Sequence, residues 1–266
     1  MSQASIVQAE TQSDFTGCFV WHELASPDPE AAIKFYGRVL GWTATPVPEM
    51  SYTVMNADGQ EVAGIRSAFP QEPQAWGGYI GTKDVDGIAK RIAQSGGTIC
   101  REPGDIPGIG RFAVALDPFG AAFNLFNPIP KETPDQRQPG MPGHVGWNEL
   151  RAGEWQRAFA FYADLFGWTK DRAVDMGPMG TYQIFAIHGV PSGGMLTIGA
   201  CGMNLSPSWM FYWNVKDVDD SVRTLKEAGG EVTQGPMQVP GGSWIVQARD
   251  PQNVAFALVQ PANSAP

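Results

Sequence analysis

The sequence predicts an α+β protein built from two copies of one module, each copy with two βαβ-rich halves of about 60 residues. The first observation is an internal repeat, because Trp21–Leu24 recurs as residues 147–150. The second is that alternating, strand-like segments in each copy are separated by two segments with the apolar spacing of a helix. The third is a proline-rich segment between the copies without hydrophobic periodicity, which is typical of a linker.

The repeat extends through both copies. Seven further features keep their order, at offsets of 126, then 130, then 133 residues: Phe35-Tyr36 and Phe161-Tyr162, Gly41-Trp42 and Gly167-Trp168, Tyr52 and Tyr182, Gly64 and Gly194, Lys83–Asp86 and Lys216–Asp219, Gly96-Gly97 and Gly229-Gly230, and Asp117-Pro118 and Asp250-Pro251. So many matches in one order indicate a duplication, and units of this length exclude a solenoid of short repeats.

Each copy is predicted to follow one order of elements. Residues 17–24 alternate as in a strand, and Asp28 offers an N-cap for a helix that starts at Pro29 and ends before Gly41. The helix carries an apolar stripe of Ala32, Phe35, Tyr36, Val39 and Leu40. The other expected elements of the first copy are strands near 51–56, 61–68 and 76–82, a helix near 84–95, and strands near 98–102, 111–116 and 121–126.

These features predict two duplicated domains, at residues 17–127 and 143–260. The proline-rich linker covers residues 128–142. Polar tails are expected at residues 1–16 and 261–266, where chain ends usually pack least.

Composition limits the classes of function. Hydrophobic residues make up 43% of the 266 residues and charged residues 17%, so the chain can form a core and is not expected to be disordered. Acidic residues outnumber basic ones by 27 to 18, and this excess disfavours nucleic acid or an anionic membrane as partner. No apolar run reaches the ~18 residues of a membrane span, and the first residues do not resemble a signal peptide. The sequence therefore predicts a cytoplasmic monomer or homodimer with a small-molecule ligand.

The cysteines and histidines give no recognisable site. The three cysteines are odd in number and form no CxxC pair, so no disulfide framework is expected. The three histidines are scattered without metal-ligand spacing, and His22, whose counterpart is Asn148, is expected to be packed or at the surface. The residues concerned are Cys18, Cys100, Cys201, His22, His144 and His188.

The ordered motifs resemble those of the vicinal oxygen chelate superfamily of glyoxalases, bleomycin-resistance proteins and extradiol dioxygenases. They are the strand–helix segment ending in FYxxxxGW, the KDVD before the second helix, the GG after it and the DP turn before the last strand, each present twice. The resemblance implies tandem βαβββ modules that form curved mixed sheets around a pocket, often with a divalent metal held by inward strand residues. It also implies a lyase, isomerase or dioxygenase activity.

The residues at the family's metal-ligand positions depart from the pattern. The family's first ligand position falls on Trp21 in the first copy and on Trp147 in the second. The ligand position on the strand before KDVD falls near Gly77 and Met210. The ligand position on the last strand falls on Asn124 and Ala257. Of these only Asn124 carries a donor, and a weak one. No metal ligand and no cofactor are therefore predicted, and a divalent metal would need an atypical site.

Glu23 and Glu149 are the candidate catalytic residues. Because strand side chains alternate, Trp21 and Glu23 share a face, and Trp147 and Glu149 do the same in the second copy. A carboxylate in an apolar cleft has a raised pKa and could transfer a proton or hold a cationic or hydroxylated ligand. The equally weighted alternative is that both glutamates bond backbone groups at a module junction and fix strand register.

The candidate ligand-binding residues are mostly aromatic. They are Trp21, Trp147, Tyr52, Tyr182, Trp76, Trp209 and Asn124. For two pairs of equivalent residues, Tyr52 with Tyr182 and Trp76 with Trp209, packing in the core is favoured over ligand binding.

Two functions remain open, with a partner-binding scaffold as a third. One is an enzyme that acts on a small oxygenated molecule, through an atypical metal site or through metal-free acid–base chemistry by Glu23 or Glu149. The other is a non-catalytic protein that sequesters a planar or aromatic antibiotic or metabolite between its tryptophans.

Overall fold

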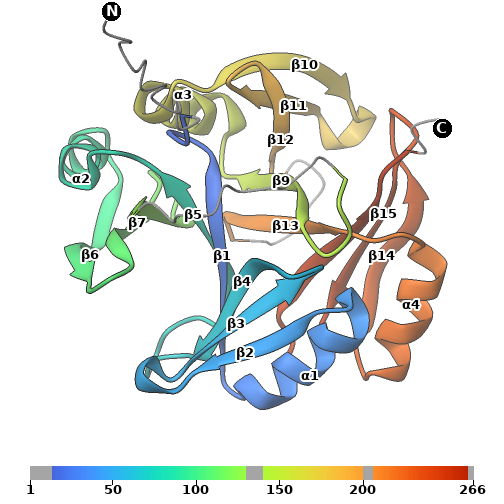
Figure 1. Ribbon diagram of the computed structural model, residues 1–266. Coiled ribbons are helices and arrows are strands. Elements are labelled where there is room, and N and C mark those ends of the chain that lie inside the picture. The colour runs from blue at the N-terminus through green and yellow to red at the C-terminus, as the bar shows by residue number, and fades with distance from the viewer. Residues whose placement is uncertain (1–13, 130–139, 200–205, 263–266) are drawn as a thin grey trace, which may run out of the picture.

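The computed structural model describes residues 14–129, 140–199 and 206–262. Within these ranges the chain forms two mixed eight-stranded sheets and four α-helices (Figure 1). This architecture confirms the predicted α+β class and the tandem modules. Most of the expected N-terminal tail and linker, the last four residues, and Cys201 lie outside the described residues.

The first sheet contains two βαβββ modules. Their elements are β1 (Phe19–Ser26), α1 (Pro29–Leu40), β2 (Thr43–Val47), β3 (Tyr52–Ala57) and β4 (Gln60–Ser67), then β5 (Ala75–Gly81), α2 (Val85–Gln94), β6 (Thr98–Ile106), β7 (Gly110–Leu116) and β8 (Ala122–Pro128). The strand order is β2-β3-β4-β1-β5-β8-β7-β6. In each module the first and last strands are parallel, and the two modules join where β1 and β5 pair antiparallel.

The second sheet repeats this arrangement. Its elements are β9 (Val145–Ala152), α3 (Trp155–Phe166), β10 (Thr169–Asp175), β11 (Thr181–Ile187) and β12 (Val190–Thr197), then β13 (Ser208–Asn214), α4 (Val218–Glu227), β14 (Glu231–Gln238), β15 (Trp244–Arg249) and β16 (Ala255–Gln260). The order β10-β11-β12-β9-β13-β16-β15-β14 matches the first sheet strand for strand.

The first helix begins and ends where its sequence signals predict. The Asp28 side chain accepts the N–H of Ala31 at 3.1 Å, Pro29 follows at the first helical position, and Gly41 closes the helix with φ 71°. All five residues of the predicted apolar stripe are buried. Helix α3 ends in the same way at Gly167, also with φ 71°.

Strands β2 and β10 are not predicted from the sequence. Both are edge strands, and almost every residue of each is exposed. Neither therefore carries the apolar alternation that identifies a strand. Pro46 within β2 fits this location, because an edge strand tolerates the loss of one backbone donor.

One face of each sheet packs, together with the helices, into a core shared by both halves. Helix α1 lies beside α4, although nearly 200 residues separate them in the sequence (Figure 1). Helices α2 and α3 contact each other in the same way. Among the residues that the structure describes, no helix has both the length and the apolar character to cross a membrane.

Two buried tyrosine–aspartate contacts join the halves. Tyr36 on α1 donates its hydroxyl proton to Oδ2 of Asp250 at 3.1 Å, and Tyr162 on α3 donates to Oδ2 of Asp117 at 3.4 Å. The other carboxylate oxygen of each aspartate accepts two backbone N–H groups of its own turn. Burial raises the pKa of both Asp117 and Asp250, although the hydrogen bonds they accept oppose the shift.

The tryptophan of each FYxxxxGW motif also contacts the other half. The indole N–H of Trp42 donates to the carbonyl of Gly143 at 2.9 Å, just before β9. The indole N–H of Trp168 donates to the carbonyl of Gly17 at 2.9 Å, just before β1. Both motifs therefore hold the start of the other half's central strand.

We expect the stability of the chain to depend on the ionisation of these two aspartates. A carboxyl whose pKa is raised by folding binds protons more readily in the folded protein than in the unfolded chain. Its contribution to the free energy of unfolding is therefore complete below its unfolded-state pKa and is lost as pH rises through its folded-state pKa. The double variant D117N/D250N lacks this titration. Its free energy of unfolding, relative to that of the natural chain, should therefore increase as pH rises above about 4.

Urea unfolding at a series of pH values measures this difference. The exposed turn residue Asp58, changed to asparagine, provides the control. A difference between D117N/D250N and the natural chain that stays constant with pH would contradict the prediction.

Candidate functional site

The face of each sheet that points away from the shared core carries a repeated polar and aromatic cluster. We call it the site face. On the first sheet it carries Trp21, Glu23, Tyr52, Arg66, Tyr79 and Asn124, and on the second sheet Trp147, Glu149, Arg151, Tyr182, Tyr212 and Gln247. Strand alternation explains the arrangement, because the residues between them, such as Leu24 and Leu150, are buried in the core.

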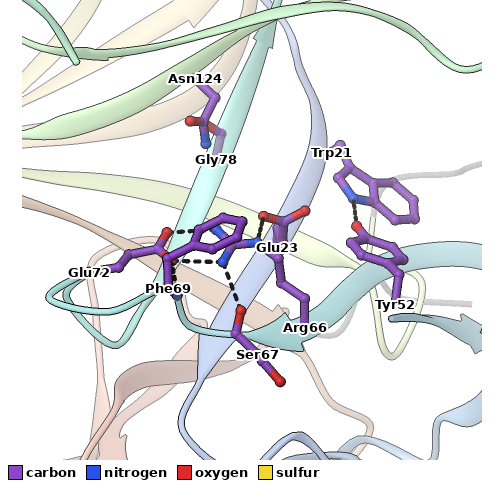
Figure 2. A network of polar contacts seen from close by, with 9 residues as sticks. All are labelled: Trp21, Glu23, Tyr52, Arg66, Ser67, Phe69, Glu72, Gly78 and Asn124. Atoms are coloured by element: carbon purple, nitrogen blue, oxygen red, sulfur yellow. Dashed lines mark hydrogen bonds and ion pairs between the residues drawn. The ribbon is translucent and has the colours of Figure 1, made fainter. Parts of the chain in front are cut away.

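On the first sheet the cluster is centred on Glu23 (Figure 2). The indole N–H of Trp21 donates to the hydroxyl of Tyr52 at 2.8 Å. One carboxylate oxygen of Glu23 accepts from Nε of Arg66 at 2.7 Å. The hydroxyls of Tyr52 and Tyr79 lie near Glu23 and interact with its carboxylate. Side chains from three different strands therefore surround the carboxylate.

A short loop after β4 fixes Arg66 (Figure 2). Glu72 accepts two hydrogen bonds from the Arg66 guanidinium, at 2.7 and 2.6 Å, and the Phe69 ring lies 4.8 Å from the guanidinium carbon. The hydrogen bonds from Arg66 lower the pKa of Glu72. Arg66 is therefore clamped between two carboxylates.

On the second sheet Glu149 occupies the corresponding place. Its Oε2 accepts from the hydroxyls of Tyr182 at 3.2 Å and Tyr212 at 3.0 Å, and its Oε1 lies 3.5 Å from Nε of Arg151. The indole N–H of Trp147 donates to Tyr182 at 2.8 Å, as Trp21 does to Tyr52. Glu149 is only 7% exposed.

The tyrosines around both glutamates are hydrogen-bond donors. Burial, followed by the neighbouring Glu23, raises the pKa of Tyr52 and Tyr79. Burial and Glu149 do the same for Tyr182 and Tyr212. All four hydroxyls therefore keep their protons at neutral pH.

This environment differs from the apolar cleft expected around Glu23 and Glu149. Each carboxylate lies among tyrosine hydroxyls and an arginine. The alternative of backbone bonding also needs revision, because the observed partners are side chains. Both glutamates do lie at the junction of two modules, where β1 pairs with β5 and β9 with β13.

The structure separates the other aromatic candidates into two groups. Tyr52 and Tyr182 lie on the site faces, each bonded to a tryptophan. Trp76 and Trp209 instead lie in the shared core, 6% and 8% exposed, and their indole N–H groups donate to Tyr36 and Tyr162. They are packing residues on the opposite face of their strands.

The remaining candidates are placed as follows. Asn124 lies on the site face as the register partner of Tyr79. His22 packs in the core against Phe211 and Trp213, in agreement with the expected packed role. Cys18 is half-buried, and Cys100 is exposed.

Several residues of the clusters were not singled out in the sequence. Tyr79 and Tyr212 stand 133 residues apart, an offset that the KDVD motifs share, so the repeat contains the signal that could have found them. Arg66, Glu72, Arg151 and Gln247 each occur in one half alone. The duplication gives no signal for such residues.

The residues that the sequence places at the family's metal-ligand positions offer few groups that could bind a metal. The Trp21 and Trp147 indoles are donors bonded to tyrosines, and indole nitrogen of this kind does not ligate metals. Gly77, Met210 and Ala257 offer no oxygen or nitrogen from a side chain. Across the described ranges, no three His, Cys, Asp or Glu side chains are grouped to hold a metal ion.

The two tyrosines bonded to tryptophan lie directly over a glycine of the neighbouring strand. A Cβ atom added at Gly64 would lie 1.7 Å from the Tyr52 hydroxyl oxygen, and one at Gly194 would lie 2.1 Å from Cε1 of Tyr182. Neither glycine has a left-handed backbone. The space taken by the tyrosine ring is therefore what requires glycine at these positions.

We predict that Gly64→Ala displaces Tyr52 and breaks its hydrogen bond with Trp21. Overpacking of this kind costs about 1–3 kcal/mol in the free energy of unfolding. The double variant G64A/Y52A should recover part of that loss, because it removes the ring that clashes. Denaturant unfolding and tryptophan emission measure the two effects, and equal stability of G64A and the natural chain would refute the steric explanation.

Comparison with known proteins agrees with this architecture. A model of the Glyoxalase/Bleomycin resistance protein/Dioxygenase superfamily matches residues 19–125 and 142–258. The anthracycline biosynthesis protein DauV of Streptomyces sp. (strain C5) is 33% identical over 263 residues, which cover 92% of this chain and 93% of that protein.

Solved structures show the same fold at low identity. The Mn(II)-bound glyoxalase of Novosphingobium aromaticivorans superimposes with a TM-score of 0.62 at 17% identity, covering 92% of this chain and 82% of that one. The 2,2',3-trihydroxybiphenyl 1,2-dioxygenase of Sphingomonas wittichii strain RW1 gives 0.64 at 14% identity, with 90% and 88% covered. With both halves matched by one family model, this chain belongs to the Glyoxalase/Bleomycin resistance protein/Dioxygenase superfamily.

Proposed function

We propose that this protein binds a planar, oxygenated aromatic molecule on the site face of its first sheet, and that it does so without a metal ion. The observation that carries the proposal is the combination there of half-buried rings and polar groups. Trp21 and Tyr52 are half-buried, as are Glu23 and Asn124. Ring faces of this kind stack on flat aromatic molecules, and a few polar groups fix their orientation.

Asn124 is the group best placed to read an oxygen substituent. Its Nδ2 contacts the carbonyl of Gly78 only at 3.5 Å, the outer limit of a hydrogen bond. The amide therefore retains donor and acceptor capacity for a ligand. The amide lies against Gly77, where an added Cβ would be 3.2 Å from Nδ2, so glycine leaves room for the Asn124 side chain.

The second sheet is less suited to the same ligand. Ala257 replaces Asn124 as the register partner of the central tyrosine, here Tyr212. Tyr212, Met210 and Val259 form a small buried apolar cluster, and Glu149 is buried beside them. The polar groups of this face are bonded to one another, as in the hydrogen bond from Gln247 to the Tyr212 hydroxyl at 2.7 Å.

Binding without catalysis fits the surroundings of Glu23 better than proton transfer does. The Arg66 guanidinium donates to the Glu23 carboxylate at 2.7 Å, and the hydroxyls of Tyr52 and Tyr79 interact with the same group. A carboxylate held in this way acts as a fixed acceptor that orients the two tyrosines. We therefore assign Glu23 and Glu149 to positioning within the site faces.

The named relative supports the class of ligand. DauV is an anthracycline biosynthesis protein, and anthracyclines are flat polycyclic aromatics that carry hydroxyl and carbonyl groups. Such a molecule matches the paired rings of Trp21 and Tyr52 and the amide of Asn124. Other oxygenated polycyclic compounds share this chemistry.

We predict that 1,4-dihydroxyanthraquinone quenches the tryptophan fluorescence of the protein in buffer that contains EDTA. Trp21→Phe should lower the affinity about five- to tenfold, because it removes ring area and the hydrogen bond that orients Tyr52. Asn124→Ala should lower it by a similar factor. The matched control is Trp147→Phe on the second sheet, which should leave the affinity unchanged.

Two outcomes would contradict this assignment. Equal losses in W21F and W147F would show that the first sheet has no special role. Conversion of the quinone to a new compound, detected by mass spectrometry after incubation and lost in Glu23→Gln, would show catalysis instead of binding.

The metal-free part of the proposal has its own test. Calorimetric titration with Mn²⁺, Zn²⁺ and Fe²⁺ should reveal no stoichiometric binding tighter than about millimolar, because the ligand positions offer too few donors. Affinity for the quinone should be the same with EDTA and with added Mn²⁺. A tenfold gain in affinity on adding one equivalent of metal would overturn it.

A further inference from the structure

The site face of the first sheet continues beyond Asn124 to the edge strand β6. Val114 on β7 is the register partner of Asn124, and Arg101 on β6 is the register partner of Val114. Such partners in antiparallel strands point to the same face of the sheet. Ala113 and Ala115 on either side of Val114 are fully buried in the shared core, so Val114 and Arg101 lie on the site face.

Aromatic rings connect Arg101 with the cluster around Glu23. The guanidinium carbon of Arg101 lies 4.4 Å from the centre of the Phe112 ring. Phe112 is the register partner of Phe126, whose ring meets that of Tyr79 edge to face at 5.9 Å. Tyr79 in turn interacts with Glu23. Arg101 and the polar cluster therefore belong to one continuous surface.

The Arg101 guanidinium is exposed and its donors are unused. Among the residues that the structure describes, it forms no hydrogen bond or ion pair, whereas Arg66 on the same face is held by two carboxylates. Contact with the Phe112 ring restrains the side chain without using its N–H groups. Two neighbouring N–H groups of a guanidinium match the two oxygens of a carboxylate. Arg101 is thus an accessible group for binding an anion.

The register places this guanidinium in line with the groups assigned to ligand binding. Trp21, Tyr79, Asn124, Val114 and Arg101 form one row of partners across five neighbouring strands. At ~4.8 Å between strands, the row spans roughly 19 Å along the sheet. A ligand does not have to span all of it, because the indole and the guanidinium at the two ends are long side chains. The row therefore suits an elongated flat molecule with an anionic group at one end.

The acidic groups of the first sheet do not oppose an anion at that end. Glu23 lies on β1, so it is also roughly 19 Å from β6 along the sheet. Salt screens exposed charges over about 8 Å at physiological ionic strength. The Arg66 guanidinium, 2.7 Å from Glu23, further reduces the field of that carboxylate.

The second sheet lacks this feature. Gln234 occupies the position equivalent to Arg101, at the same offset of 133 residues that relates Asn124 to Ala257. The register is the same, since Gln234 pairs with Gln247 and Gln247 with Ala257. The guanidinium is therefore, like the Asn124 amide, a property of the first sheet alone.

We propose that Arg101 binds a carboxylate group of the ligand, so that the first sheet is specific for planar aromatic carboxylates. This inference rests on the proposed function, because it assigns the charge of the ligand bound by the same face. The fused rings lie between Trp21 and Val114, with an oxygen substituent at the Asn124 amide. The carboxylate at the far end accepts hydrogen bonds from Arg101.

Anthraquinone-2-carboxylate and anthraquinone-2-carboxamide are matched probes, since they have nearly the same size and differ in charge. Quenching of tryptophan fluorescence in buffer with EDTA should show that the natural protein binds the carboxylate about five- to tenfold more tightly. Arg101→Gln, which introduces the residue of the second copy, should abolish this preference and leave carboxamide affinity unchanged. Arg101→Lys should retain part of it, because it keeps the charge and loses the planar fork.

The matched control is Arg172→Gln, which removes the same charge from an exposed position on β10 of the second sheet. It should leave both affinities unchanged. Trp21→Phe should weaken the two compounds equally, because ring stacking does not depend on the charge of the substituent.

A second measurement needs no substitution. Raising the salt concentration should weaken binding of the carboxylate and leave binding of the carboxamide unchanged, because the guanidinium is exposed. This comparison decides the matter even where Arg101→Gln fails to fold.

Three results would overturn the role of Arg101 and leave the proposed function intact. They are equal affinity of the natural protein for the two compounds, a folded R101Q protein that still prefers the carboxylate, and equal losses of both compounds in R101Q. The last would show that Arg101 only supports the Phe112 ring. Failure of the natural protein to bind either compound would instead overturn the proposed function, and this inference with it.

Discussion

The buried contacts of Tyr36 with Asp250 and Tyr162 with Asp117 determine how the two halves meet. Each tyrosine lies on the first helix of one half, and each aspartate lies in the last turn of the other. Desolvation makes each aspartate costly to ionise, as its raised pKa indicates, so the hydroxyl of a tyrosine is a needed partner. The two contacts lie at equivalent places on either side of the interface, and residues of both halves pack into one common core.

The position of the site faces follows from that constraint. Once the core takes one face of β1, strand alternation leaves Trp21 and Glu23 on the other face. The same holds for Trp147 and Glu149 on β9. Duplication thus supplied two equivalent clusters, and divergence made them different: Asn124 with its weakly bonded amide remains on one sheet, while the other sheet became an interlocked, largely buried network.

The extent to which the sequence predicts this structure depends on the kind of signal. The helix around Tyr36 carried its cap, stripe and stop locally, and these were correct. Strand β2 was missed because an exposed edge carries no apolar alternation. Trp76 and Tyr52 were treated alike in the sequence analysis, because a repeat identifies equivalent positions without showing which face of a strand meets the other half. Tyr79, three residues beyond Trp76 on the same strand, faces the site instead. Arg66 belongs to one half only, so the repeat could not reveal it.

The packed aromatic pair of Trp21 and Tyr52 limits how easily this part of the first sheet could become a metal site. Trp21 and Tyr52 bond to each other, and Tyr52 occupies the space above Gly64. A single substitution that introduced one ligand would leave the tyrosine in place and provide no complete donor set, so metal binding would require several coordinated changes. A difference at one neighbouring position, Asn124 on the first sheet and Ala257 on the second, instead changes the polarity of the site face and leaves the aromatic pair in place. Substitutions beside the pair therefore change the polarity of the site face more easily than they could build a metal site.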